Sequence, residues 1–196
     1  IFNCMNSIKS LIQQNNQDKA IMYLTTFSKL IRTIFQNSDK REISLFDEIE
    51  TCKLYTQLER MRFGNKFNYQ FNIDETIDLK SVQVPALIIQ PFIENAIWHG
   101  IVPKTDGGIV KVSVEQTGDT LCCTIEDNGI GREVSKQNKF KGETTSHQSK
   151  RIQLTQTRLD LDNALNKRSA TVVTTDKKDA EGKSNGTKVV VTFKEY

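Results

Sequence analysis

Residues 85–100 place polar side chains inside an apolar helical pattern, and no other stretch limits the possible folds of the chain as much. The apolar spacing predicts a helix over these residues, and Pro91 within it predicts a kink or the true helix start. Glu94, Asn95 and His99 do not belong in a helix core, and Asn95 and His99 share one helix face. The three suit a hydrated Mg²⁺ and the phosphates that it carries. The alternative is a solvated polar stripe.

A second polar cluster follows a predicted strand at residues 120–126. Asp127 comes directly after the strand and can accept a hydrogen bond from an exocyclic amine such as that of adenine. Gly129 and Gly131 flank one aliphatic residue and allow the backbone to approach a flat ligand closely. Alone, Asp-Asn-Gly is also an ordinary turn signal. Gly186 and Thr187 form a third candidate ligand-binding segment, at the start of the last predicted strand.

These three segments, in this order and spacing, resemble the ATP-binding domain shared by DNA gyrase, histidine kinases and MutL. Glu94-Asn95-Ala96 resembles its N box, residues 127–131 resemble its first glycine box, and Gly186-Thr187 resembles its last. Residues 1–8 are similar to the Phe-Asn-x-Leu-Asn-x-Ile segment of LytS-type sensor histidine kinases, and residues 90–100 to the N box of those kinases. The resemblance covers nearly the whole chain and implies a cytoplasmic kinase core of that type.

The resemblance also implies a role for each site residue, with ATP and Mg²⁺ as cofactors. Asn95 would give an oxygen to Mg²⁺, and Glu94 would order metal-bound water or polarise the site. His99 would face the phosphates, unless it is a surface histidine at the helix end. Asp127 would bind the adenine amine. The other nucleotide contacts would come from Gly129, Gly131, Ser149, Lys150, Gly186 and Thr187.

The chain departs from the pattern of that family at three points. Trp98 stands where many members have a lysine, so a cation near the phosphates is missing. The middle glycine box falls on residues 149–152, where both glycines are absent, although the serine and lysine there can still donate to phosphate. The phosphoacceptor histidine is expected immediately upstream of Ile1, since neither His99 nor His147 occupies its position.

Periodicity along the chain predicts an α+β fold, an N-terminal helical hairpin followed by a two-layer α/β sandwich, which the resemblance identifies as Bergerat-type. The predicted domains are residues 1–63, a helical dimerisation region of the phosphoacceptor type, and residues 64–196, the ATP-binding catalytic domain. Residues 132–150 are polar and predict a mobile lid, or else an ordinary surface loop. The predicted helices are 1–14, 19–36, 44–63 and 152–166, and the predicted strands are 66–73, 109–116, 120–126, 170–175 and 187–193.

Composition excludes few functions. The 27 basic and 24 acidic residues give no argument for binding nucleic acid. No apolar run approaches the roughly 18 residues needed to cross a bilayer, and no signal peptide is evident. The four cysteines lack zinc-site spacing and indicate free thiols in a reducing cytoplasm. The chain begins inside an apolar helix without a methionine, which predicts a fragment of a longer protein.

The resemblance therefore implies a protein-histidine kinase of a two-component system. It would bind Mg·ATP, work as a homodimer, and transfer the γ-phosphoryl group to a histidine and on to a response regulator. That regulator often has a DNA-binding output domain, so no direct contact with nucleic acid is expected. The whole protein would reach a bacterial cytoplasmic membrane through segments outside this chain. The alternatives are a degenerate, non-catalytic dimerisation and nucleotide-binding module, and a clamp ATPase of the gyrase type.

Overall fold

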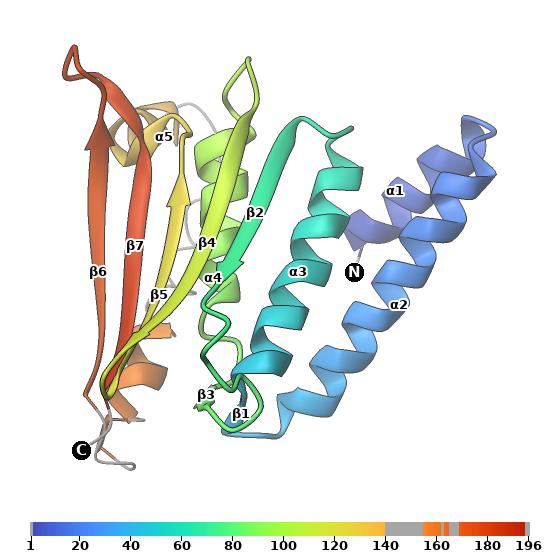
Figure 1. The fold of residues 1–196 in the computed structure, drawn as a ribbon. Helices are drawn as coiled ribbons and strands as arrows, with labels where there is room; N and C mark the ends of the chain where they lie inside the picture. The colour runs from blue at the N-terminus through green and yellow to red at the C-terminus, as the bar shows by residue number, and fades with distance from the viewer. Residues whose placement is uncertain (1, 140–154, 162, 165–168, 195–196) are drawn as a thin grey trace.

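The computed structural model describes residues 2–139, 155–161, 163–164 and 169–194 (Figure 1). Its N-terminal part is helical: α1 (Phe2–Gln13) folds back along α2 (Gln17–Ser38), which packs antiparallel to α3 (Leu45–Arg62). These bounds lie within two residues of the predicted ones. The predicted N-terminal helical hairpin is confirmed, with α2 and α3 as its two arms.

The start of α3 is set by a side-chain cap at Ser44. The Ser44 hydroxyl accepts a hydrogen bond from the Asp47 backbone N–H at 3.1 Å and donates to the Asp47 carboxylate at 2.9 Å. Directly before this cap, β1 (Glu42–Ser44) pairs antiparallel with β3 (Gln83–Pro85), a short sheet that was not predicted. The pairing ties the entrance of α3 to the segment that leads into the polar stretch.

A five-stranded mixed sheet forms the second layer, in the order β2-β4-β5-β7-β6. β2 and β4 are parallel and the other neighbours are antiparallel, with β4 and β5 joined as the predicted hairpin. The strands are β2 (Phe67–Ile73), β4 (Gly108–Thr117), β5 (Thr120–Asp127), β6 (Ser169–Lys178) and β7 (Ser184–Lys194). All the predicted strands are present, and the last two are longer than predicted.

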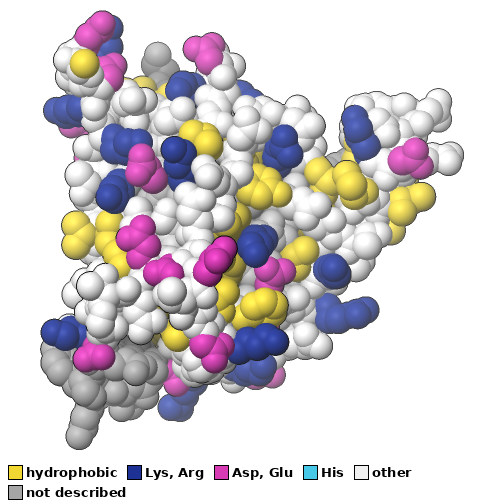
Figure 2. All heavy atoms as spheres, in the orientation of Figure 1, with side chains coloured by type: hydrophobic (Ala, Val, Ile, Leu, Met, Phe, Trp, Pro, Cys, Tyr) yellow, Lys and Arg dark blue, Asp and Glu magenta, His cyan; other side chains and the backbone are white. Residues whose placement is uncertain are grey.

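Helices cover one face of this sheet and leave the other face open. Val110, Val112 and Val114 of β4 are buried beneath α3 and the helices that follow β3, so the alternation predicted for this strand is confirmed. The open face, turned toward the viewer in Figure 2, carries interspersed positive and negative charges. Glu126 belongs to this face, because it lies between the buried residues Ile125 and Asp127 of β5. The architecture is the predicted two-layer sandwich.

The polar stretch does not form the predicted single helix over residues 85–100. α4 (Gln90–Asn95) begins next to Pro91. Of the two predicted alternatives for this proline, a kink or the true helix start, the second is confirmed. The chain then continues as a π-helix, η1 (Ala96–Ile101), which ends with the Val102 N–H bonded to the Ile97 carbonyl at 2.8 Å. A π-turn inside an α-helix is rare and frequently marks a functional site.

Residues 131–139 are also different from the prediction. They form α5 (Gly131–Lys139), whereas the polarity of residues 132–150 predicts a lid or an ordinary surface loop. The remainder of that lid lies outside the described residues. The predicted helix 152–166 is helical wherever it is described, at residues 155–161 and 163–164. Of the helices in these described parts, none has the length and apolarity needed to span a bilayer.

Glu48 is a buried carboxylate that joins α3 to the start of α4. Its side chain is 0% exposed and accepts hydrogen bonds from the backbone N–H groups of Leu87 at 2.9 Å and Ile89 at 2.8 Å. Leu87 has a φ of 58°, an unfavourable angle for a branched side chain, and Glu48 holds this turn in place. Burial raises the pKa of Glu48, and the backbone N–H donors oppose that shift. The carboxylate thus positions the helix that bears the polar residues.

Replacing Glu48 with alanine is expected to lower the free energy of unfolding by at least about 2 kcal/mol, because two buried N–H groups lose their acceptor. The matched control is Glu50→Ala on the same helix, where the side chain is 43% exposed and pairs with Lys53. That control is expected to change stability by less than about 0.5 kcal/mol. Urea unfolding measures both, and equal losses would show that Glu48 does not hold the turn.

Candidate functional site

Asp127, the last residue of β5, is the centre of the site. Its side chain is only 4% exposed, and Oδ1 accepts a hydrogen bond from the Gly129 N–H at 2.8 Å. The backbone N–H of Thr187 lies near this carboxylate and lowers its pKa. The hydrogen bond from Gly129 orients the carboxylate, which keeps lone pairs for a further donor.

Three glycines close around Asp127, each from a different segment. A Cβ on Gly100 would lie 2.7 Å from Asp127 Oδ1, and a Cβ on Gly129 would overlap the Gly100 backbone. A Cβ on Gly186 would overlap the Asp127 carbonyl oxygen. The Ile130 N–H bonds to the Gly100 carbonyl at 2.9 Å and holds two of these segments together. The three polar segments of the sequence therefore meet here, with room for backbone but not for side chains.

Burial raises the pKa of Asp127, which lies at about 6 once the effects of the neighbouring groups are included. The Gly129 N–H and Lys177 lower the pKa, whereas Glu126 raises it. The Lys177 ammonium donates to Glu126 at 2.6 Å and to the Asp127 carbonyl oxygen at 3.3 Å. At neutral pH most of the Asp127 side chains are ionised, so the site offers a buried anionic acceptor to an amine.

Asn128 stabilises the turn behind Asp127, a role that was not predicted. Its side-chain oxygen accepts from the Ile109 N–H at 2.8 Å, and its backbone oxygen accepts from the Lys104 ammonium at 2.9 Å. Gly131 follows with a φ of 75° and lies against Ser184 of β7. These contacts fix the first glycine segment against β4 and β7.

The N-box residues occupy the α4–η1 junction. Glu94 and Asn95 end α4, His99 lies within η1, and all three are half-buried. Glu94 lies near the C-terminal end of α3, because it contributes to raising the pKa of Glu59, which burial raises to about 7. In a π-helix, hydrogen bonds span five residues, so Asn95 and His99 are still separated by about one turn.

Trp98 packs on the end of α3. Its ring meets the Phe63 ring edge-on, with centroids 5.1 Å apart, and the Arg62 guanidinium carbon lies 4.6 Å from the Trp98 ring centroid. This contact could not be read from the spacing of residues 85–100, because the partner lies one helix earlier in the chain. The side chain at this N-box position is thus a stacking platform.

The structure brings together the predicted residues Asp127, Gly129, Gly186 and Thr187, and it adds Gly100, which the sequence analysis treated only as part of the helix pattern. Ser149 and Lys150 lie outside the described residues, as does the rest of the middle glycine segment. A glycine after an amphipathic pattern usually signals a helix end. Gly100 was interpreted in this way, and its close contact with Asp127 was therefore not predicted.

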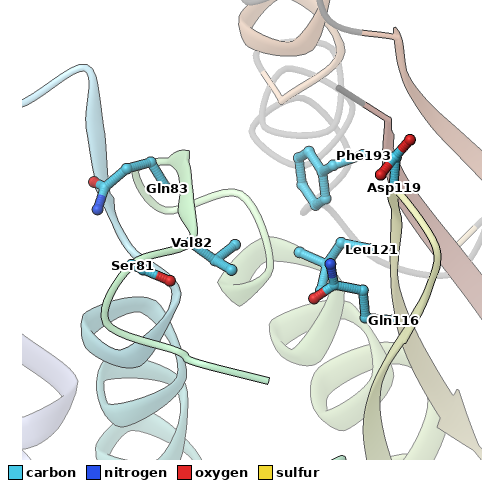
Figure 3. Close-up of a pocket in the computed structure, with 7 residues that line it drawn as sticks. All are labelled: Ser81, Val82, Gln83, Gln116, Asp119, Leu121 and Phe193. Atoms are coloured by element: carbon cyan, nitrogen blue, oxygen red, sulfur yellow. The ribbon is translucent and has the colours of Figure 1, made fainter. Parts of the chain in front are cut away.

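A separate pocket of about 240 Å³ opens at the other end of the sheet (Figure 3). It lies beside the β4–β5 turn and is lined by Ser81, Val82, Gln83, Gln116, Asp119, Leu121 and Phe193. Leu121 and Asp127 are at opposite ends of β5, about 20 Å apart at 3.3 Å per residue. The pocket is therefore not part of the site around Asp127.

Comparison with known proteins agrees with this geometry. Residues 1–67 match the family described as histidine kinase, and residues 82–196 match the family described as histidine kinase-, DNA gyrase B-, and HSP90-like ATPase. The second match covers more than half of the chain and contains every described residue around Asp127.

Two relatives illustrate the extent of the similarity. The sensor histidine kinase YpdA of Escherichia coli (strain K12) is 34% identical over 131 residues, which are 67% of this chain and 22% of that protein. The sensor histidine kinase/phosphatase LytS of Staphylococcus aureus (strain MRSA252) is 32% identical over 145 residues, 74% of this chain and 24% of that protein. The chain therefore spans about a fifth to a quarter of the length of these two relatives.

Solved structures share the fold at low sequence identity. The histidine kinase domain of the Erythrobacter litoralis blue-light activated histidine kinase EL346 has a TM-score of 0.51 and 14% identity, covering 92% of this chain and 81% of that one. The catalytic domain of the histidine kinase ThkA has a TM-score of 0.50 and 12% identity, covering 79% and 94%. The predicted two-layer architecture is thus confirmed by independent structures.

Proposed function

The chain belongs to the histidine kinase-, DNA gyrase B-, and HSP90-like ATPases, as a LytS-type sensor histidine kinase core, and from this membership we propose that it phosphorylates a histidine with Mg·ATP. The observation that supports this most is Asp127, a buried carboxylate with fixed orientation in a cradle of glycine backbone. An adenine amine fits such an acceptor, and the glycines allow three backbone segments to pack closely around it.

The proposed nucleotide contacts follow from this arrangement. Asp127 accepts from the adenine amine, and Thr187 lies beside Asp127, where its backbone N–H lowers the pKa of the carboxyl. Gly129, Gly131 and Gly186 allow their segments to pack closely around Asp127. Ser149 and Lys150 are proposed to donate to the phosphates, on the basis of sequence alone. The domain division at residues 63 and 64 also remains a proposal.

Asn95 is the proposed Mg²⁺ ligand, with Glu94 beside it. An amide oxygen and a carboxylate on one half-buried helix turn are hard oxygen donors of the kind that Mg²⁺ prefers. The metal would neutralise charge on the phosphates during transfer. His99, one turn along the same helix, is proposed to face the phosphates.

The proposed reaction moves the γ-phosphoryl group from ATP to a histidine nitrogen. A nitrogen–phosphorus bond forms as the bond from phosphorus to the leaving oxygen of ADP breaks, and an aspartate of a response regulator then takes the group. The protein contributes mainly positioning and charge stabilisation. A DNA-binding output domain on the regulator would make any contact with DNA; this chain would not.

A homodimer is proposed from the surface of the N-terminal helices. Several large apolar side chains of α1 and α2 face solvent, with exposed fractions of 47–70%, namely Met5, Ile12, Ile21, Met22, Leu24 and Phe35. Pairing of two such hairpins into a four-helix bundle would bury them. Attachment of the whole protein to a bacterial cytoplasmic membrane is proposed through segments outside this chain.

One specific observation favours a second candidate, a non-catalytic nucleotide-binding module. The middle glycine box is absent from the sequence at residues 149–152, which would weaken closure over the phosphates. A clamp ATPase of the gyrase type is disfavoured, because its catalytic glutamate would fall on Pro91.

Incubation of the whole protein with γ-labelled ATP tests the proposed kinase activity. Acid-labile, base-stable label on the protein is expected, and it should pass to a response regulator aspartate. Sedimentation of the same preparation is expected to show a dimer. Nucleotide binding without any labelling, in a folded dimer, would instead favour the non-catalytic module.

A further inference from the structure

Arg62, the last residue of α3, lies beside Trp98 of the N box. Trp98 occupies the place where many LytS-type kinases have a lysine. The Arg62 guanidinium carbon is 4.6 Å from the Trp98 ring centroid and 5.3 Å from the Phe63 ring centroid, both within the range of cation–π contacts. A positive charge is therefore present at this point of the site, and it comes from a different helix.

The guanidinium has unused hydrogen-bonding capacity. Its charged partner is Glu59, at 3.6 Å between Nη1 and Oε2, which is too long for a hydrogen bond. Within the described part of the chain, Arg62 has no other hydrogen-bonding or ionic partner, and its side chain is 20% exposed. Guanidinium carries five N–H donors in a planar fork that matches phosphate. The group is thus held in place by two rings while its donors stay available.

The position of Arg62 along the N-box helix matches the expected position of the phosphates. Asp127 would bind the base next to Gly100, at the C-terminal end of η1. A nucleotide running back along this helix would bring its phosphates to Asn95, about one turn earlier. Glu94 and Arg62 belong to one charge cluster at this level, because both act on Glu59.

We propose that Arg62 binds the terminal phosphate of a nucleoside triphosphate, with Trp98 as the platform that holds its guanidinium. The charge that a lysine at position 98 would supply thus comes from α3. In the free protein Glu59 pairs weakly with the guanidinium, and the phosphate replaces this carboxylate on binding. The assignment rests on the proposed nucleotide site and names the residue that distinguishes ATP from ADP.

Arg62→Gln tests the proposal, because glutamine keeps a planar group on the Trp98 ring and removes the charge. Affinity for Mg·ATP, measured by calorimetry, is expected to fall roughly 10-fold to 100-fold, since charge-assisted contacts are strong. Affinity for Mg·ADP is expected to stay within about twofold. The matched control is Lys53→Gln, which removes a 42% exposed charge from the same helix and should change neither affinity.

Charge rescue separates a phosphate contact from a packing role. Adding Trp98→Lys to Arg62→Gln is expected to restore most of the affinity for Mg·ATP, which a packing role would not allow. Equal weakening of ATP and ADP, or no rescue by the lysine, would overturn the assignment while the parent still binds ATP. A folded parent chain that binds neither nucleotide would overturn the proposed function itself, and this assignment with it.

Discussion

Asp127→Asn is expected to lower the affinity for ATP at least about 30-fold in a chain that remains folded. The carboxylate accepts a hydrogen bond from the backbone N–H of Gly129, and the backbone N–H of Thr187 also lowers its pKa. Asparagine has one acceptor oxygen instead of two, so its NH₂ group must face either a backbone N–H or the adenine amine. An unpaired donor of this kind costs about 1–3 kcal/mol, and the contact with the base is lost in addition. Calorimetric titration with Mg·ATP measures the change.

Glu126→Gln is the matched control, one residue earlier on the same strand. Its carboxylate lies on the open face and pairs with Lys177, so ATP affinity is expected to stay within about threefold of the parent. A Glu126→Gln loss as large as that of Asp127→Asn would show that general charge near the strand end, rather than the buried acceptor, governs binding.

Asp127→Asn also tests an expected effect of pH on stability. Asp127 has a folded-state pKa of about 6 against an ordinary 3.8, so the folded chain binds more protons between these values. The contribution of Asp127 to the free energy of unfolding therefore decreases as pH rises from about 4 to about 6, by up to roughly 3 kcal/mol. This decrease is expected to be absent in Asp127→Asn. Urea unfolding across that range measures it, and an unchanged slope would contradict the assigned pKa.

Gly186→Ala is expected to destabilise the chain by at least about 3 kcal/mol and to abolish nucleotide binding. The residue has a φ of 98°, and an added Cβ would overlap the Asp127 carbonyl oxygen. The strand end must move to accept a methyl group, and Asp127 moves with it. The measurements are thermal or urea unfolding and titration with Mg·ATP.

Gly182 provides a matched control on the same β6–β7 hairpin. It also has a positive φ, 78°, but nothing lies within 4 Å of its Cβ position. Gly182→Ala therefore isolates the conformational cost, about 1–2 kcal/mol, and should leave ATP binding intact. If the two substitutions destabilised the chain equally, close packing at Gly186 would not be the cause.

The architecture was predictable because its signals are local. Alternation in β4 and β5, helical spacing in α1 to α3, and the Ser44 cap all act over a few residues, and all are present in the structure. These features depend on neighbours in sequence, so a single chain reveals them. The meeting of the site segments, by contrast, was predicted only through the resemblance to a known family.

The boundaries of the N-box helix were only partly predictable, because they depend on distant residues. Pro91 offered the true start as one alternative, and a start at residue 85 is wrong because β3 pairs with β1 and Glu48 stabilises a turn at Leu87. The stacking of Arg62 on Trp98 and the approach of Gly100 to Asp127 likewise join separate segments. Neither helical periodicity nor motif spacing contains this information, since each is a tertiary contact.

α5 was missed for a different reason. Residues 131–139 are polar, with a helical start at a glycine and no apolar face long enough to identify. Arg132 pairs with Asp176 of β6 through two contacts of 2.7 Å, and this anchors the beginning of the helix on the sheet. The helix is therefore specified partly by a contact across 44 residues of sequence.

Titration of this chain and of Asn95→Ala with Mg·ATP, or with a non-hydrolysable analogue, tests the central claim most directly. The account predicts binding to the parent in the micromolar to millimolar range and loss of most of that affinity in Asn95→Ala, where the proposed metal ligand is missing. No binding to a parent chain whose circular dichroism shows an intact fold would contradict it.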